Sequence, residues 1–149
     1  MNASSNPDLT EDELDVLVSI AIQRAELLSD QRLPAARAAW QEVLQYEVRL
    51  SEITDAGELP GGVARVGAIA AALAAGNRIL ADQLRSKYEG EPCLPAERRK
   101  AIERVFTEDR EDWERRYPSL AGRRRTRPID LAVWRKSIAE RPRVFPVCA

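Results

Sequence analysis

The sequence predicts an all-α protein, a compact bundle of five to six helices with a basic C-terminal appendage. Apolar residues recur at i, i+3 and i+4 spacing in successive segments of the chain. Proline and glycine separate those segments, and no stretch has the sustained period-2 alternation of a β-strand. A chain of 149 residues is also long enough to bury a hydrophobic core without disulfides or a metal.

The first predicted helix covers residues 10–29. Thr10 and Glu13 have the spacing of a capping box, and the acidic first turn suits the positive end of the helix dipole. Its apolar face is wider than that of an ordinary surface helix, so we expect this helix to be central. The aliphatic residues that widen the face are Val16, Ile20, Ile22 and Leu27.

A second helix is expected to begin near Pro34, where the missing N–H of proline costs nothing. Its predicted buried stripe consists of Ala36, Ala39, Trp40, Val43, Leu44 and Leu50. Glycine and proline in residues 55–62 predict a break, after which small residues at 63–75 form a third helix. Gly76 is expected to end that helix in a left-handed conformation.

Three further helices follow in this interpretation, at residues 78–89, from Pro95 to Pro118, and from Pro128 to Pro142. One core is expected to join the helices of the body. Its predicted members are Leu17, Ala21, Trp40, Val43, Leu73, Leu84 and Phe106.

The first four helices predict two antiparallel hairpins, in which a turn is followed by alanine and then by an aromatic or bulky residue. The residues that fit this pattern are Ala36, Trp40 and Val43 in the first hairpin, and Gly76 and Ala81 in the second. The pattern resembles the second half of a tetratricopeptide hairpin, which implies a repeat of two-helix units. Arg24 and Ile69 stand where that family has a small residue, and the apparent period of about 45 residues exceeds its period of about 34. The alternative is an ordinary helical bundle.

Charge divides the chain into a body and a tail. Residues 1–120 carry 15 basic and 22 acidic residues, whereas residues 121–149 carry eight basic and two acidic residues. We therefore expect a disordered N-terminus at 1–9, a helical domain at 10–120 and a basic tail at 121–149. A short helix in the tail needs a surface for its apolar side, either on the body or on another chain. For residues 123–127, a solvated linker is a further interpretation. The candidate partner-binding residues are Arg123, Arg124, Arg125, Arg127, Trp134, Ile138 and Phe145.

Histidine is absent, which removes the commonest general base and the commonest transition-metal ligand. Asp109 and Asp112 lie one helical turn apart and could share a magnesium ion. Glu111 and Arg115, however, have the spacing of a helical ion pair, which favours a solvated helix face.

Two other motifs give weaker indications of chemistry. The pair Gly61-Gly62 lacks the lysine of a phosphate-binding loop and predicts a flexible connector. Cys93 precedes a helix, but without histidine a buried or idle thiol is the favoured interpretation. We expect no catalytic residue, no cofactor and no metal.

The sequence thus predicts a non-enzymatic interaction or adaptor subunit of a larger assembly, whose tail binds a protein partner or a second copy with an acidic surface. The alternative is a nucleic-acid-binding accessory subunit of a ribonucleoprotein or defence complex, in which residues 123–127 contact phosphates and Trp134 stacks on bases. A carboxylate–metal enzyme using Asp109 and Asp112 is a third hypothesis.

The expected compartment is the cytoplasm. No secretory signal is visible, and no apolar run has the roughly 20 residues needed to cross a membrane. Abundant alanine and arginine, with few lysines, are typical of a bacterial genome rich in G and C.

Overall fold

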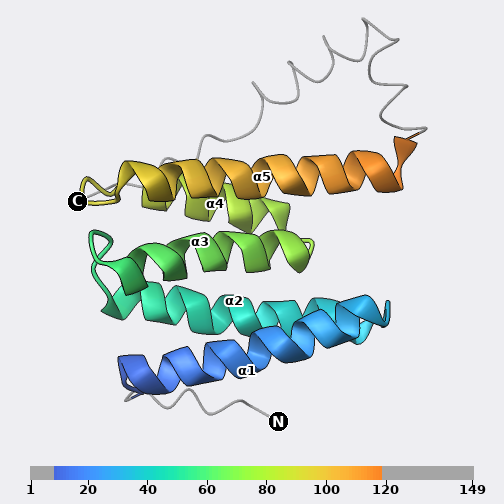
Figure 1. Cartoon of the computed structure of the whole chain (residues 1–149), viewed down its shortest axis with the longest axis horizontal. Coiled ribbons are helices and arrows are strands. Elements are labelled where there is room, and N and C mark those ends of the chain that lie inside the picture. The colour runs from blue at the N-terminus through green and yellow to red at the C-terminus, as the bar shows by residue number, and fades with distance from the viewer. Residues whose placement is uncertain (1–8, 119–149) are drawn as a thin grey trace, which may run out of the picture.

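The computed structural model describes residues 9–118, which form five α-helices and no strand. The helices are α1 (Glu11–Asp30), α2 (Ala35–Ile53), α3 (Leu59–Ala74), α4 (Arg78–Glu89) and α5 (Ala96–Arg116). Successive helices run antiparallel and form a stack with α1 at one end and α5 at the other (Figure 1). The prediction of an all-α bundle of antiparallel hairpins is confirmed. The N-terminus expected to be disordered at 1–9, apart from Leu9, and the expected sixth helix lie outside the described residues.

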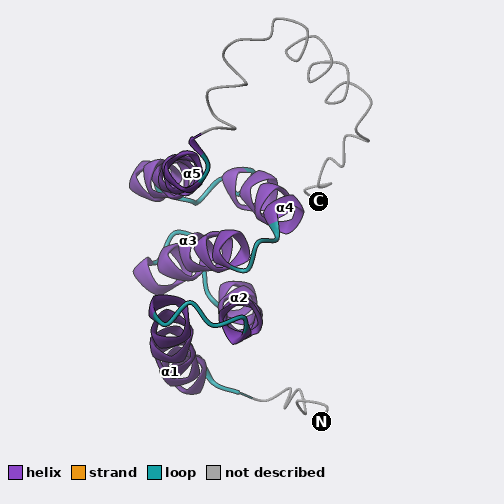
Figure 2. Ribbon diagram, turned by 90° about the vertical axis from the view of Figure 1, so that its right-hand side faces the viewer, coloured by secondary structure: helices purple, strands orange, loops and turns teal. Residues whose placement is uncertain are grey.

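The stack has two sides, because the chain zigzags between them. Viewed along the helices, α1, α3 and α5 lie on one side and α2 and α4 on the other (Figure 2). The central helix is α3, which contacts α2, α4 and α5. Its buried positions are mostly alanine and glycine, and these small side chains let three neighbours approach it closely.

The position of α1 differs from the prediction, because α1 lies at the edge of the stack and packs mainly on α2. Leu14, Val18, Ala21 and Ala25 form its buried face. The aliphatic residues Val16, Ile20 and Leu27, which suggested a central helix, point away from that face and are exposed.

The main core contains five of the seven residues predicted for it. They are Ala21, Val43, Leu73, Leu84 and Phe106. Trp40 is half-buried and packs against this core, and Leu17 is half-buried and does not belong to it. In α2, the rest of the predicted stripe is buried except Ala36, which is half-buried.

The capping box predicted for α1 is present. The Glu13 amide donates to Thr10 Oγ1 at 3.3 Å, and the Thr10 amide donates to Glu13 Oε2 at 2.8 Å. At the end of α3, Gly76 has a φ of 76°, as expected for a left-handed helix end. Both signals depend on a few adjacent residues, which explains why they can be read from sequence.

The start of α3 was predicted wrongly. The helix begins at Leu59, so Pro60, Gly61 and Gly62 belong to its first turn and do not form a flexible connector. A Cβ atom on Gly61 would overlap the backbone oxygen of Asp55. The glycine therefore allows the chain to enter α3 directly against the segment that leaves α2.

A buried arginine near the start of α3 connects this helix to the end of α2 and to the α4–α5 loop. Arg65 is 6% exposed, and its Nε donates to Glu91 Oε2 at 2.9 Å. Its other nitrogens donate to the carbonyl oxygens of Gly61, at 2.9 Å, and Thr54, at 3.2 Å. The guanidinium also lies over the Tyr88 ring, 5.7 Å from its centroid. Because the charge is paired and hydrogen-bonded, its burial is compatible with a stable fold.

Candidate partner-binding surfaces

A cleft of about 1170 Å³ lies on the side of the stack where α1, α3 and α5 have their C-terminal ends. Three helices contribute apolar lining residues, which include Trp40, Ala70, Leu73, Ala74 and Val105. The Trp40 indole is held in place, because its Nε1 donates to Ser29 Oγ at 2.8 Å. Apolar lining residues of this kind suit the apolar side of a protein segment. We call this surface the α2–α5 cleft.

The two walls of the α2–α5 cleft differ in charge. Arg32 and Arg37 line the wall formed by the α1–α2 turn and α2, whereas Glu108, Asp109, Asp112 and Arg116 line the α5 wall. Arg37 lies against Gly76, since a Cβ atom on that glycine would be 3.2 Å from Arg37 Nη2. The cleft is therefore polarised, because the first wall has two cations and the α5 wall has three carboxylates and one cation.

Arg32 has an unusual backbone conformation for its residue type. Its φ is 53°, in the left-handed region, where glycine is the ordinary residue. The hydrogen bonds are those of a Schellman motif, with the Leu33 amide bonded to the Leu28 oxygen at 3.0 Å. The α3–α4 turn uses Gly76 at the equivalent position. A non-glycine residue in this conformation at the rim of a cleft is an indication of function, because such strain persists where the side chain is needed.

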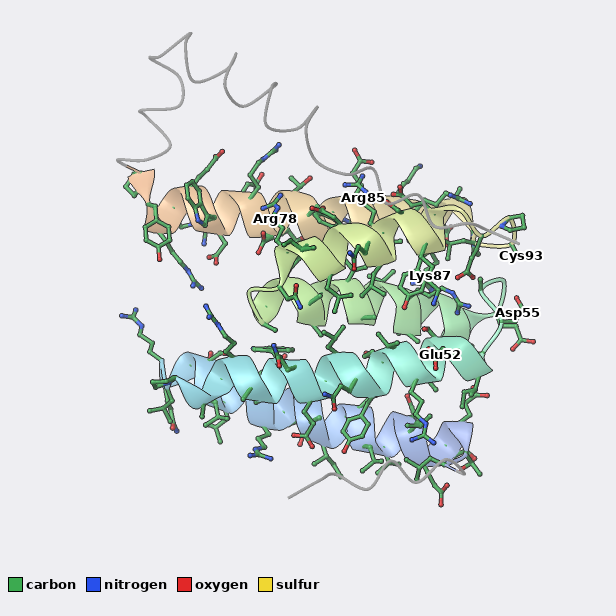
Figure 3. The ribbon with its side chains drawn as sticks, turned by 180° about the vertical axis from the view of Figure 1, so that it is seen from behind. Glu52, Asp55, Arg78, Arg85, Lys87 and Cys93 are labelled. Carbon is green, nitrogen blue, oxygen red and sulfur yellow. The ribbon has the colours of Figure 1, made fainter. Side chains whose placement is uncertain are left out.

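The two carboxylates proposed as magnesium ligands face arginines. Asp109 lies 3.5 Å from Arg78 Nη1, and Asp112 lies 3.0 Å from Arg116 Nη2. Burial raises the pKa of Asp109, while the charge of Arg78 opposes that shift. Within residues 9–118, no group of three or more His, Cys, Asp or Glu side chains could hold a metal ion. Figure 3 shows Arg78 where α4 meets α5.

The expected pair between Glu111 and Arg115 is not the one that forms. Arg115 Nη1 lies 3.8 Å from Asp112 Oδ1, one turn earlier in the helix. Both side chains are largely exposed, so this ion pair contributes little to stability.

A second candidate surface is the outward face of α1. Val16, Ile20 and Leu27 are 58%, 59% and 58% exposed and lie within about 40° of one another around the helix. We call these three residues the outer stripe. By the same helical geometry, Asp12, Glu13 and Asp30 flank it. The combination of exposed aliphatic side chains and carboxylates is typical of a surface that binds another protein.

A shallower groove of about 720 Å³ lies on the opposite side of the stack, between α2 and α4. Leu44, Val48, Leu80 and Leu84 form its apolar surface. Its rim includes Glu52, which Figure 3 shows on α2. Its charged lining residues are Arg49 and Glu52, both on α2, so charges do not face one another across the groove as they do in the α2–α5 cleft.

Cys93 lies in the loop between α4 and α5 and is exposed. A buried thiol, one of the two forms expected from the sequence, is therefore wrong. That loop adjoins the α2–α3 loop: a Cβ atom on Gly57 would be 3.4 Å from both Asp55 Oδ1 and the Cys93 oxygen. Asp55 and Cys93 accordingly appear on the same side of the molecule in Figure 3, where the α2–α3 and α4–α5 loops lie. Within residues 9–118, Cys93 is the only cysteine, so no second thiol is available to it there.

The seven predicted tail residues, from Arg123 to Phe145, lie outside the described part of the chain. The structure instead identifies Arg32 and Arg37, which the sequence did not single out. It also exposes the outer stripe, which the sequence assigned to the wide apolar face of a central helix. A signal for the stripe existed, because the apolar arc of α1 is wider than one neighbouring helix can cover. Arg32 could not be found in this way, since nothing in its local sequence distinguishes it from a solvated arginine.

None of the helices at residues 9–118 is both long and apolar enough to cross a membrane. Comparisons of the chain with protein-family models, with curated proteins and with solved structures find no match. The tetratricopeptide resemblance therefore has no support beyond its pattern of residues.

Proposed function

We propose that the protein is a non-enzymatic interaction subunit of a larger assembly, and that it binds other proteins through its basic tail and through the outer stripe of α1. The observation that carries this proposal is the outer stripe. Three large aliphatic side chains stand more than half exposed on one helix, where burying them against a partner would be favourable.

The charges next to the two surfaces support a protein partner. The stripe is flanked by carboxylates, which would repel nucleic acid, whereas the tail has a net charge of about +6 and would be attracted to carboxylates. The polarised α2–α5 cleft offers a further place for a protein segment, with Trp40 as an aromatic contact.

The ion pairs of Asp109 and Asp112 favour a structural role for the carboxylates on α5. Each carboxylate already has a guanidinium partner within 3.5 Å. A metal would have to compete with these arginines, which makes the carboxylate–metal enzyme the weaker hypothesis.

The alternative function, binding of nucleic acid, is favoured by one feature, the four arginines within residues 123–127. It requires the tail to act against an acidic body, because residues 1–120 have seven more acidic than basic residues. We therefore place it second.

The test is affinity purification of the tagged full chain from the cells that express it, with and without nuclease treatment. We expect a protein to co-purify in both cases, and to be lost when residues 121–149 are deleted or when the stripe residues are changed to serine. Ile53, Leu59 and Ile79, which are exposed elsewhere, supply a matched serine control. Material that co-purifies only without nuclease would contradict the proposal and support the alternative.

A further inference from the structure

The outer stripe of α1 lacks a partner helix in the described part of the chain, and α1 is the uncovered end of the stack. Its opposite end is different: the outward residues of α5 are charged or polar, including Lys100, Glu103, Arg104 and Glu111, all exposed. Helical stacks need a polar outer face at each end to remain single in water. The α5 end meets this requirement and the α1 end does not.

The chemistry around the stripe specifies what would cover it. From residue 11 to residue 30, α1 contains six acidic residues and Arg24 as its one basic residue. Arg24 is already paired with Glu42 on α2, at 3.6 Å. A covering segment should therefore present an aliphatic or aromatic stripe between basic side chains, which matches a basic amphipathic helix.

The chain itself contains a segment with this pattern. In residues 128–142, Leu131, Trp134 and Ile138 follow the spacing i, i+3, i+7 of one helix face. Arg135 and Arg141 fall on either side of that face by helical geometry. A stripe flanked by carboxylates and a stripe flanked by guanidiniums are complementary in both apolarity and charge.

We propose that residues 128–142 of one copy bind the outer stripe of α1 on a second copy, which links the copies head to tail. This inference rests on the proposed function and names the partner of the tail. Each copy would contribute its outer stripe to one contact and residues 128–142 to another, so it would bind two others, and a heterologous contact of this kind builds rings or open chains.

Binding within one copy is disfavoured by distance. The described chain ends beside α5, at the far end of the stack from α1 (Figures 1 and 2). Three steps between packed helices, at about 8–10 Å each, separate α5 from α1, and the stripe faces outward beyond them. The ten residues from Pro118 to Pro128 reach at most about 33–36 Å when fully extended. An intramolecular contact would need nearly all of that length, whereas a second copy imposes no such constraint.

The test measures self-association of the purified full chain by sedimentation velocity over a wide concentration range. The stripe variant carries Val16→Ser, Ile20→Ser and Leu27→Ser, and the segment variant carries Leu131→Ser, Trp134→Ser and Ile138→Ser. The unaltered chain should associate, and each variant should associate more weakly by a factor on the order of 100, since three apolar side chains lose their contact. The Ile53, Leu59 and Ile79 serine control should associate like the unaltered chain.

Mixing the two variants gives the sharper result. Each keeps one of the two complementary surfaces, so the mixture should form one-to-one dimers and nothing larger. Circular dichroism should show that the stripe variant remains helical, because its changed residues are exposed. The segment variant should keep the helices of residues 9–118, because its changes lie outside them. Association should weaken at high salt, as expected for charge pairs at a rim.

Three outcomes would overturn the inference. They are a monomeric unaltered chain at all concentrations, variants that associate like the unaltered chain, and a mixture that fails to dimerise. A monomeric chain would leave the proposed function intact if a different protein still co-purified through the tail or stripe. Loss of that co-purification as well would refute both.

Discussion

The carboxylate of Glu47 on α2 occupies the space next to Gly67 on α3, where a Cβ atom would overlap Glu47 Oε1. Glu47 is 4% exposed, and burial, together with the charge of Asp15 on α1, raises the pKa of Glu47 to about 7. An acidic residue thus lies where three helices meet, in a position that favours its protonated form.

Glu47→Gln should stabilise the protein near neutral and alkaline pH. In the unfolded chain Glu47 ionises near its ordinary pKa of 4.5, and in the folded protein near 7, so the folded state holds the proton more tightly. The free energy of unfolding therefore falls as pH rises from about 4.5 through about 7, and the total loss from Glu47 is roughly 3 kcal/mol. Glutamine does not titrate and should remove this slope.

The measurement is urea unfolding of both proteins from about pH 5 to about pH 8, where the difference in free energy should grow with pH. Glu52→Gln, on the exposed part of the same helix, is the control and should leave the slope unchanged. Equal slopes for Glu47→Gln and the unaltered protein would show that Glu47 is ionised in the fold.

Gly61→Ala should destabilise the protein more than Gly67→Ala. A methyl group at Gly61 would overlap the backbone oxygen of Asp55, which cannot move without shifting the α2–α3 connection. At Gly67 it would meet the end of the Glu47 side chain, which can rotate away. We expect a loss of about 2 kcal/mol or more at Gly61, measured as a lower unfolding midpoint in urea. Equal effects would show that the two sites are equally able to adjust.

Arg32→Gly should raise stability by about 0.5–1 kcal/mol while weakening any partner binding in the α2–α5 cleft. Glycine relieves the left-handed strain at φ 53°, but it removes a cation from the cleft wall. Thermal unfolding and affinity for the co-purified partner would measure the two effects. Gly76→Arg, at the equivalent turn, should lower stability. If Arg32→Gly left partner affinity unchanged, the strain at Arg32 would have no connection with binding.

Deleting residues 121–149 should leave the body folded. Within residues 9–118, every member of the main core lies between Ala21 and Phe106, so the deletion removes none of the contacts among them. Helical circular dichroism and the thermal midpoint of residues 1–120 should stay close to those of the full chain, measured at a concentration where the full chain is monomeric. A truncated chain that fails to fold would place the last segment in the core.

Replacing Arg123, Arg124, Arg125 and Arg127 with serine should slow association with a protein partner more than it speeds dissociation. The arginines would act by long-range attraction to carboxylates, which affects encounter more than the bound state. Surface plasmon resonance at low and high salt would measure the association rates of the variant and the unaltered chain. The difference between these rates should become smaller at high salt. A change confined to the dissociation rate would indicate direct buried contacts.

Much of the fold could be predicted because its signals are local. The capping box at Thr10 and the left-handed Gly76 each depend on a few neighbouring residues, and the order of helices follows from apolar spacing between breakers. Those signals determine where most helices begin and end, and that no strand forms in residues 9–118. These local signals are enough to predict the helical hairpins of this protein, without information about how the helices pack.

Tertiary packing decided the rest, for a physical reason that α1 and α3 illustrate. Periodicity shows that Val16, Ile20 and Leu27 share a face, but not whether a neighbouring helix covers that face. Likewise, the glycines at the start of α3 look like a loop until the close approach of Asp55 is known. Arg32 and Asp112, which are 80 residues apart in sequence, line the same cleft. Glu47 on α2 is buried next to Gly67 on α3. Burial and proximity between distant segments depend on how helices pack, and it is this packing that created the candidate surfaces.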